Sequence, residues 1–143
     1  MKIKAAVVDK KGDQFAIRDD IELAEMQPDD IQVKMVASGI CHSDEALRKG
    51  DAVIDYPIIL GHEGSGIVEK VGSHVQNFEP GDHVVLSFYS CRNCEKCLKG
   101  KPTQCLHYGE NNLSGIRPDK TAHFTENGEK VADMFDQSSF TTT

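Results

Sequence analysis

Four cysteines within fifteen residues constrain this chain more than any other feature. They follow the spacing C-x2-C-x2-C-x7-C and stand at Cys91, Cys94, Cys97 and Cys105. Thiolates at this spacing can converge on one ion at roughly 2.3 Å each, and four of them complete a tetrahedral shell with no open position. The spacing therefore predicts a structural zinc site, since a full shell leaves no place for substrate.

Disulfides and iron are the alternatives for these thiols. Disulfides are typical of oxidising compartments, and we expect no export leader, because the N-terminus lacks the basic and apolar pattern of one. Arg92, Lys96 and Lys99 lie within or beside the cluster and would stabilise a negatively charged tetrathiolate. A rubredoxin-like iron in the same shell is the other metal to consider.

Length and charge limit the classes of function. With 143 residues the chain accommodates one domain of ordinary size. A net charge of −7 argues against a nucleic-acid partner, which selects basic surfaces. Apolar runs such as Tyr56 to Leu60 are too short to cross a bilayer, so we predict a cytoplasmic protein with no membrane partner.

Short alternating segments bounded by Gly, Pro and Asp turns favour a mainly β barrel with few short helices. The clearest alternation runs from Ile31 to Ala37. The other predicted strands are Met1 to Val8, Gln14 to Arg18, Ile67 to Val71, His83 to Leu86, Thr121 to Phe124 and Ser138 to Thr143, with a hairpin turn at Asn127-Gly128 and a loop from Tyr108 to Asp119.

One helix is predicted after the strand that ends near Gly39. Ser43 is its expected N-cap, Asp44 and Glu45 fill its first turn, and Gly50 ends it. Cys41 is thereby placed at a strand-to-helix corner, a common position for ligands and catalytic groups.

A second set of metal-ligand side chains consists of Cys41, His62 and Glu63. His62 and Glu63 stand in a glycine-rich bend, 61–66, that is not a G-x-G-x-x-G dinucleotide fingerprint. Three protein ligands with an open position would suit a catalytic zinc. From the residues alone an equally good interpretation is a buried Cys41, a hydrogen-bonded His62 in a turn and a surface Glu63.

Three motifs resemble those of the zinc-containing alcohol dehydrogenases of the medium-chain dehydrogenase/reductase family. They are Gly39-Ile40-Cys41-His42-Ser43-Asp44, then Gly61-His62-Glu63-Gly64-Ser65-Gly66 with Gly72, and the four-cysteine segment. Glu110-Asn111-Asn112-Leu113-Ser114-Gly115 is most similar to the aryl (benzyl) alcohol dehydrogenases. The resemblance implies a GroES-like barrel with a zinc-binding cysteine lobe, and in a full-length enzyme a homodimer or homotetramer.

The resemblance also implies two zinc sites. Cys41 and His62 match the catalytic zinc ligands, and Glu63 matches the carboxylate beside that metal. Asp44 matches the carboxylate that orients His62 and so fixes its tautomer. The four clustered cysteines match the structural zinc ligands.

Further roles are implied for residues around the catalytic metal. Ser43 matches the hydroxyl that receives the alcohol proton, and His42 matches the residue that meets the cofactor pyrophosphate. Phe88 falls near a substrate-pocket aromatic residue. The implied reaction is hydride transfer from a primary, aromatic alcohol to NAD or NADP, with an aldehyde as the product.

The chain departs from the family pattern in three ways. The third catalytic ligand, a cysteine, has no counterpart here, no Rossmann fingerprint occurs, and Ala46 stands where some relatives continue a proton relay with histidine. We therefore expect 1–143 to be a GroES-like catalytic domain that is truncated at its C-terminal end and inactive alone. The alternatives are a formaldehyde, sorbitol or cinnamyl alcohol type of zinc dehydrogenase, or a non-enzymatic zinc-binding module.

Overall fold

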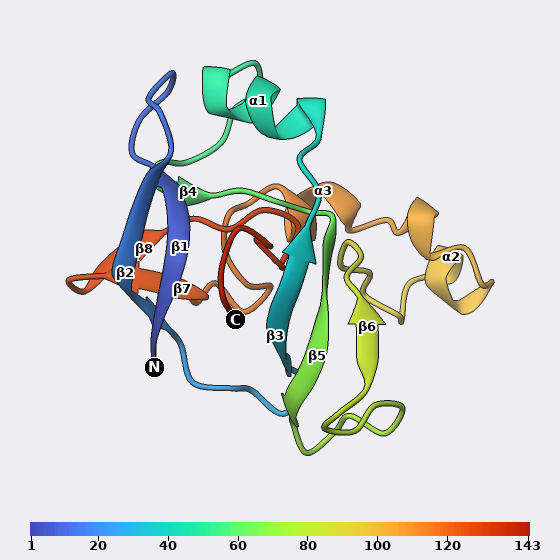
Figure 1. Ribbon diagram of the computed structural model, residues 1–143. Coiled ribbons are helices and arrows are strands. Elements are labelled where there is room, and N and C mark those ends of the chain that lie inside the picture. The colour runs from blue at the N-terminus through green and yellow to red at the C-terminus, as the bar shows by residue number, and fades with distance from the viewer.

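Two antiparallel sheets are the main elements of regular structure in the computed structural model, which describes residues 1–143 (Figure 1). The larger sheet has the order β4-β1-β2-β7-β8 and the smaller one the order β3-β5-β6. The strands are β1 (Lys2–Val8), β2 (Ala16–Leu23), β3 (Ile31–Ser38), β4 (Ile58–Ile59), β5 (Gly64–Val71), β6 (His83–Val85), β7 (Phe124–Glu126) and β8 (Glu129–Val131).

The larger sheet closes on itself. Ala132, which follows β8, forms a parallel bridge with Ile58 of β4. Its N–H donates to Pro57 O at 2.8 Å, and its carbonyl accepts from Ile59 N–H at 2.9 Å. The two edge strands therefore meet, and the expected mainly β barrel is confirmed.

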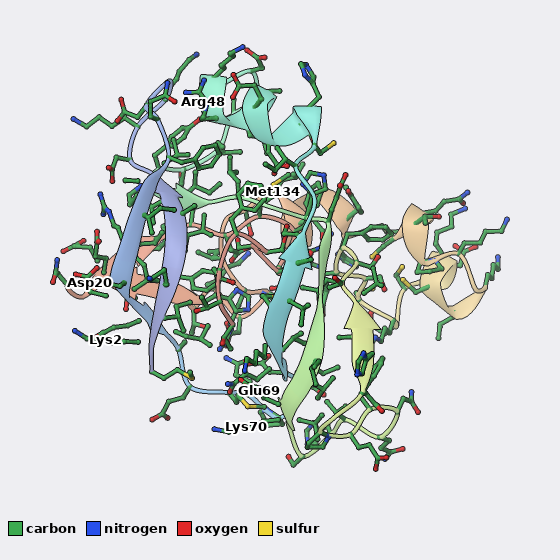
Figure 2. The ribbon with its side chains drawn as sticks, in the orientation of Figure 1. Lys2, Asp20, Arg48, Glu69, Lys70 and Met134 are labelled. Atoms are coloured by element: carbon green, nitrogen blue, oxygen red, sulfur yellow. The ribbon has the colours of Figure 1, made fainter.

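The alternation of apolar and charged residues along β1 explains which side chains form the core of this barrel. Ile3, Ala5 and Val7 are buried, whereas Lys2 and Lys4 are exposed. The buried set packs with Ile21, Ile59, Phe124 and Val131 in one core cluster. A second cluster, which includes Leu47 and Met134, lies between α1 and the barrel. Figure 2 shows Lys2, Glu69 and Lys70 projecting outward and Met134 inside.

Most predicted strands are present, but some of their limits were wrong. The second strand runs from Ala16 to Leu23, because Ile21 pairs with Ile3 and is fully buried although charged residues surround it in the sequence. The strand predicted from Thr121 begins only at Phe124. The hairpin turn at Asn127-Gly128 is confirmed between β7 and β8.

The strand predicted from Ser138 to Thr143 is wrong, since only an isolated bridge between Thr141 and Ala5 forms there. The segment instead joins the two sheets. Thr142 N–H donates to Lys4 O at 2.9 Å, and Met35 N–H donates to Thr142 O at 3.1 Å. Its hydrogen bonds are therefore divided between β1 and β3, and no regular ladder develops.

Helix α1 spans His42–Lys49 and ends, as predicted, at Gly50, which has a left-handed backbone (φ 80°). The predicted N-cap is wrong. Cys41 is the N-cap, because the Asp44 carboxylate accepts its N–H at 2.9 Å, and Ser43 lies within the first turn.

The remaining helices are short: α2 (Glu95–Leu98), η1 (Pro102–Gln104) and α3 (Tyr108–Asn112). The prediction of a loop from Tyr108 onward is wrong for the α3 residues. Asn112 Nδ2 donates to Tyr108 O within this helix and to Tyr89 O outside it, both at 2.9 Å. No helix of the chain has the length and apolar character needed to span a bilayer.

Candidate metal centres

The structure brings the four clustered cysteines together. One sulfur from each lies within 4.8 Å of the others, and Cys91 Sγ is 3.9 Å from Cys97 Sγ. Ligands at 2.3 Å on a tetrahedral ion are separated by about 3.8 Å, so this donor set fits zinc. All five cysteines of the chain are free thiols, which does not support two disulfides.

Backbone N–H groups point at these sulfurs. Cys94 N–H donates to Cys91 Sγ at 3.3 Å, and Cys91 N–H donates to Cys105 Sγ at 3.5 Å. Hydrogen bonds from the N–H groups of Leu106 and Cys97 lower the pKa of Cys94 to about 6. Burial and neighbouring thiols raise the pKa of Cys97 to about 12. The lowered pKa favours the thiolate form of Cys94. The raised pKa of Cys97 means that a metal binding there would have to displace a proton.

The second donor set forms where α1 meets the loop before β5. Ligand atoms of Cys41, His62 and Glu63 lie within 4.8 Å of one another. Cys41 comes from the N-cap of α1, and the other two precede β5. Thiolate, imidazole and carboxylate are ligands that zinc accepts, and three of them leave a position open.

Asp44 is the centre of this arrangement and is only 1% exposed. Its carboxylate accepts hydrogen bonds from Cys41 N at 2.9 Å and Gly61 N at 3.0 Å, and it lies 3.2 Å from His62 Nδ1. A carboxylate can only accept, so Nδ1 carries the ring proton and Nε2 keeps its lone pair for a metal. The same side chain therefore caps α1 and orients the histidine.

Two glycines allow close approaches, one within this site and one in the bend beside it. A Cβ on Gly39 would lie 2.2 Å from Glu63 Oε2, within the space that the carboxylate occupies. Gly61 has φ +92°, and a Cβ there would lie 2.7 Å from the Phe140 nitrogen. The Gly39 position supports a built site at Glu63, whereas Gly61 lets the bend that carries His62 pack against Phe140.

The other predicted residues lie around this set. Ser43 Oγ is 3.2 Å from His62 Nε2, so its hydroxyl borders the donors. His42 is exposed at the start of α1 and contacts none of them in the hydrogen-bond network. Phe88 is half-buried, and its ring packs against Tyr108 at 5.4 Å.

Sequence reasoning missed Tyr108 and Phe135, whose rings lie between Phe88 and His62. Phe135 packs edge-on against the His62 ring at 5.2 Å, and Tyr108 lies 6.3 Å from Phe135. Neither residue is in a segment whose periodicity predicted an ordered element. The only available signal was their aromatic character in otherwise polar surroundings.

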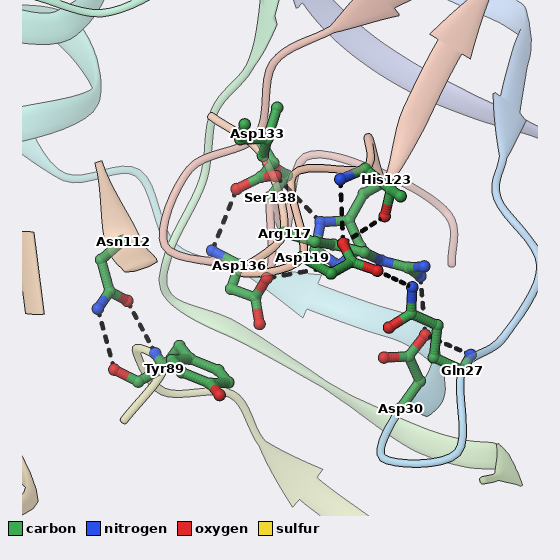
Figure 3. A network of polar contacts seen from close by, with 12 residues as sticks. Gln27, Asp30, Tyr89, Asn112, Arg117, Asp119, His123, Asp133, Asp136 and Ser138 are labelled. Atoms are coloured by element: carbon green, nitrogen blue, oxygen red, sulfur yellow. Dashed lines mark hydrogen bonds and ion pairs between the residues drawn. The ribbon is translucent and has the colours of Figure 1, made fainter. Parts of the chain in front are cut away.

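A third cluster, also missed, contains His123, Asp133 and Asp136 (Figure 3). His123 Nδ1 is 3.0 Å from Asp133 Oδ2, and Nε2 is 3.4 Å from Asp136 Oδ1. Each ring nitrogen thus faces a different carboxylate, so the histidine lies between two acids. Burial raises the pKa of Asp136 to about 6.

The barrel and the two donor sets define a class of protein: a GroES-like domain with one closed thiolate site and one open Cys/His/Glu site. The sequence profile described as "Alcohol dehydrogenase GroES-like domain" matches residues 27–131. The chain belongs to this family, as its motifs indicated.

Several proteins of known sequence or structure are similar to the chain. It is 40% identical over 135 residues to putative alcohol dehydrogenase D of Mycobacterium tuberculosis (strain ATCC 25618 / H37Rv), which covers 94% of the chain and 36% of that protein. It is also 40% identical over 141 residues to geraniol dehydrogenase of Castellaniella defragrans, with 97% and 37% covered. The chain spans little more than a third of these relatives.

Solved structures agree with this relationship. Benzyl alcohol dehydrogenase from Acinetobacter calcoaceticus is 38% identical with a TM-score of 0.92, over 99% of this chain and 38% of that one. An alcohol dehydrogenase zinc-binding domain protein from Burkholderia ambifaria is 34% identical with a TM-score of 0.94, over 99% and 39%. Both the sequence and the fold of the whole chain therefore match one part of longer dehydrogenases.

Proposed function

We propose that the chain is the catalytic domain of a zinc-dependent alcohol dehydrogenase that oxidises primary, aromatic alcohols to aldehydes. The observation on which this proposal depends is that Asp44 orients His62 and that His62 lies beside Cys41 and Glu63. The relatives support this assignment, since those with 40% identity are named alcohol or geraniol dehydrogenases. A nicotinamide-binding domain would complete the enzyme, and we call this chain together with that domain the extended protein.

Cys41, His62 and Glu63 would hold the catalytic zinc, and Cys91, Cys94, Cys97 and Cys105 the structural one. A zinc ion at the first set supplies a Lewis acid that makes an alcohol hydroxyl more acidic. The second set contributes only structure, because four thiolates fill the shell.

The chain's own residues position the alcohol and carry its proton. Asp44 holds the His62 proton on Nδ1 throughout, so Nε2 stays directed at the donor set. The Ser43 hydroxyl, which borders that set, accepts the alcohol proton and passes it outward. Ala46 offers no further group, so the proton leaves to water. A nicotinamide bound by the second domain would accept hydride from the alcohol carbon, and exposed His42 would contact its pyrophosphate.

The test compares this chain and the extended protein, each with zinc, NAD or NADP and benzyl alcohol. We expect NAD(P)H formation only by the extended protein, with a loss of at least about 100-fold in His62→Ala. Turnover by residues 1–143 alone, or an extended protein that oxidises no alcohol, would overturn the proposal. Size-exclusion chromatography with light scattering would test the proposed homodimer or homotetramer.

A further inference from the structure

We propose that His123 and Asp136 bind a third zinc ion, apart from the two cysteine-containing sites, and that Asp133 orients both ligands. One nitrogen or carboxylate oxygen from each of these three side chains lies within 4.8 Å of the others. The ion would have a structural role, because it would tie the residue that precedes β7 to the segment that follows β8. The inference is independent of the proposed alcohol oxidation.

Asp133 contacts its neighbours in the same way as Asp44 does at the Cys41 site. Its Oδ2 accepts from His123 Nδ1 at 3.0 Å, and its Oδ1 accepts the Asp136 N–H at 3.3 Å. Asp44 likewise contacts the Nδ1 of a histidine and the N–H of a ligand residue three positions away. Both carboxylates are buried. Because a carboxylate can only accept, His123 Nδ1 carries a proton and Nε2 is directed away from Asp133.

The Nε2 atom of His123 faces Asp136 Oδ1 at 3.4 Å. A charge-assisted hydrogen bond between an imidazolium and a carboxylate is about 2.7–2.9 Å long, so this separation is too long for one. Asp136 Oδ1 is shielded from solvent and has no hydrogen-bond partner in the chain. A shielded carboxylate oxygen without a donor is costly, which favours a cation between the two atoms.

The same separation indicates which metal would fit. Zinc binds imidazole nitrogen and carboxylate oxygen at about 2.1 Å, and two such ligands on a tetrahedral ion are about 3.4 Å apart. Magnesium requires octahedral geometry at a similar bond length, which would bring the two atoms to about 3.0 Å. Imidazole and carboxylate are both ligands that zinc accepts, and water would fill the remaining positions.

The charges around the cluster leave Asp136 without a close counter-ion. The Arg117 guanidinium forms its ion pair with Asp30, at 2.7 Å (Figure 3). The only ion-pair contact of Asp136 is the long one with His123. Asp133 and Asp136 can carry two negative charges between them, so a divalent cation would neutralise the pair.

The test compares zinc binding by the wild-type chain and by Asp136→Asn, with zinc in excess and a chromophoric chelator as competitor. We expect Asp136→Asn to bind one zinc fewer per chain. Asn suits the φ of 60° at this position and keeps the N–H that donates to Asp133. Asp133→Asn should weaken the site by about 10- to 100-fold. Asp119→Asn is the matched control, because this exposed carboxylate accepts from Thr121 and Gln27 outside the cluster, and it should bind as much zinc as the wild type.

A second measurement uses the wild-type chain and does not depend on the folding of a variant. In NMR spectra of the imidazole nitrogens, zinc should shift the His123 Nε2 signal while Nδ1 stays protonated. A protonated Nε2 that zinc does not change would mean that a proton, and not a metal, lies between the two acids, and it would overturn the inference. Equal zinc content in the wild type and Asp136→Asn, or an equal loss in Asp119→Asn, would overturn it as well.

Stability gives a third readout. Zinc added beyond saturation of the two cysteine-containing sites should raise the urea midpoint of the wild-type chain and leave that of Asp136→Asn unchanged. Without zinc at this cluster, the uncompensated charge of Asp136 favours the variant instead. A wild-type midpoint that does not respond to the added zinc would contradict the third site.

Discussion

Asp44 Oδ1 lies 3.2 Å from His62 Nδ1 and also accepts the Gly61 N–H at 3.0 Å, so one carboxylate oxygen contacts both His62 and the bend that carries it. The other oxygen caps α1 through Cys41. The capping of α1 and the orientation of His62 therefore depend on the same side chain. A change at Asp44 should affect the metal site more than a change at Glu45, the other carboxylate of α1.

The first prediction concerns Asp44→Asn. The amide keeps the shape but presents only one acceptor atom, so the His62 tautomer is no longer fixed. We expect the affinity of the Cys41 site for zinc to fall by about 10- to 100-fold, with little change at the cysteine cluster. Competition with a chromophoric chelator measures both sites. Asp51→Asn, at an exposed position just after α1, is the control, and equal losses in both variants would contradict the prediction.

The second prediction separates the two metal sites. No residue between Leu86 and Thr121 belongs to either core cluster, so the cysteine lobe is stabilised locally. Cys97→Ser should remove one zinc per chain and abolish hydrogen-exchange protection in α2 and η1, while β1 and β2 stay protected. Cys41→Ser is the matched control, which should lose the other zinc and keep the lobe. If Cys97→Ser also lost hydrogen-exchange protection throughout the barrel, the cysteine lobe would be shown to support the whole fold.

The sequence predicted the parts of the molecule that depend on local patterns. The alternation in β1 and β3, the turn at Asn127-Gly128 and the glycine that ends α1 are all local signals, and each is present. The three motifs also identified both donor sets, because ligand types and glycines occur at family spacings. Their convergence in space is now seen in the structure.

Features that depend on distant partners could not be predicted. Residues 138–143 have strand-like composition, but their hydrogen bonds are divided between two sheets. Helix α3 is tied to Tyr89 through Asn112, a contact over 23 positions that no periodicity reveals. Cys41 became the N-cap instead of Ser43 because Asp44, three residues later, bonds back to it. Tertiary contacts therefore decided the first two outcomes, whereas a hydrogen bond between near neighbours in the sequence decided the third.

The third prediction concerns Asn112→Ala. The substitution removes three side-chain hydrogen bonds and leaves the part-buried N–H and C=O groups of Tyr89 without these partners. We expect the free energy of unfolding to fall by about 2–4 kcal/mol, measured by urea denaturation of the zinc-loaded chain. Asn111→Ala, on the same helix but outside these bonds, should cost less than about 1 kcal/mol. Similar losses in the two variants would mean that Asn112 contributes only through helix formation.

The fourth prediction is a pH dependence that originates at Asp136. Burial raises its pKa from 3.8 to about 6, and the neighbouring carboxylates Asp133 and Asp30 act in the same direction, whereas His123 and Arg117 oppose it. A raised pKa means that the folded state binds the proton more tightly than the unfolded state. Asp136 therefore lowers stability above pH 6, and this cost diminishes as the pH falls from 6 to 4.

Asp136→Asn should remove that cost. Asn tolerates the left-handed backbone of this position, φ 60°, and still lets its N–H donate to Asp133 Oδ1. We expect unfolding free energy at pH 7.5 to rise by up to about 2–3 kcal/mol, with no gain below about pH 4.

Asp119→Asn provides a control of opposite sign. Hydrogen bonds from Thr121 lower the pKa of Asp119 to about 2, so it stabilises the fold at neutral pH and this contribution disappears on acidification. Urea denaturation between pH 4 and pH 7.5 measures the stability of both variants. If the increase in unfolding free energy of Asp136→Asn persisted at low pH, titration of Asp136 could not be its cause.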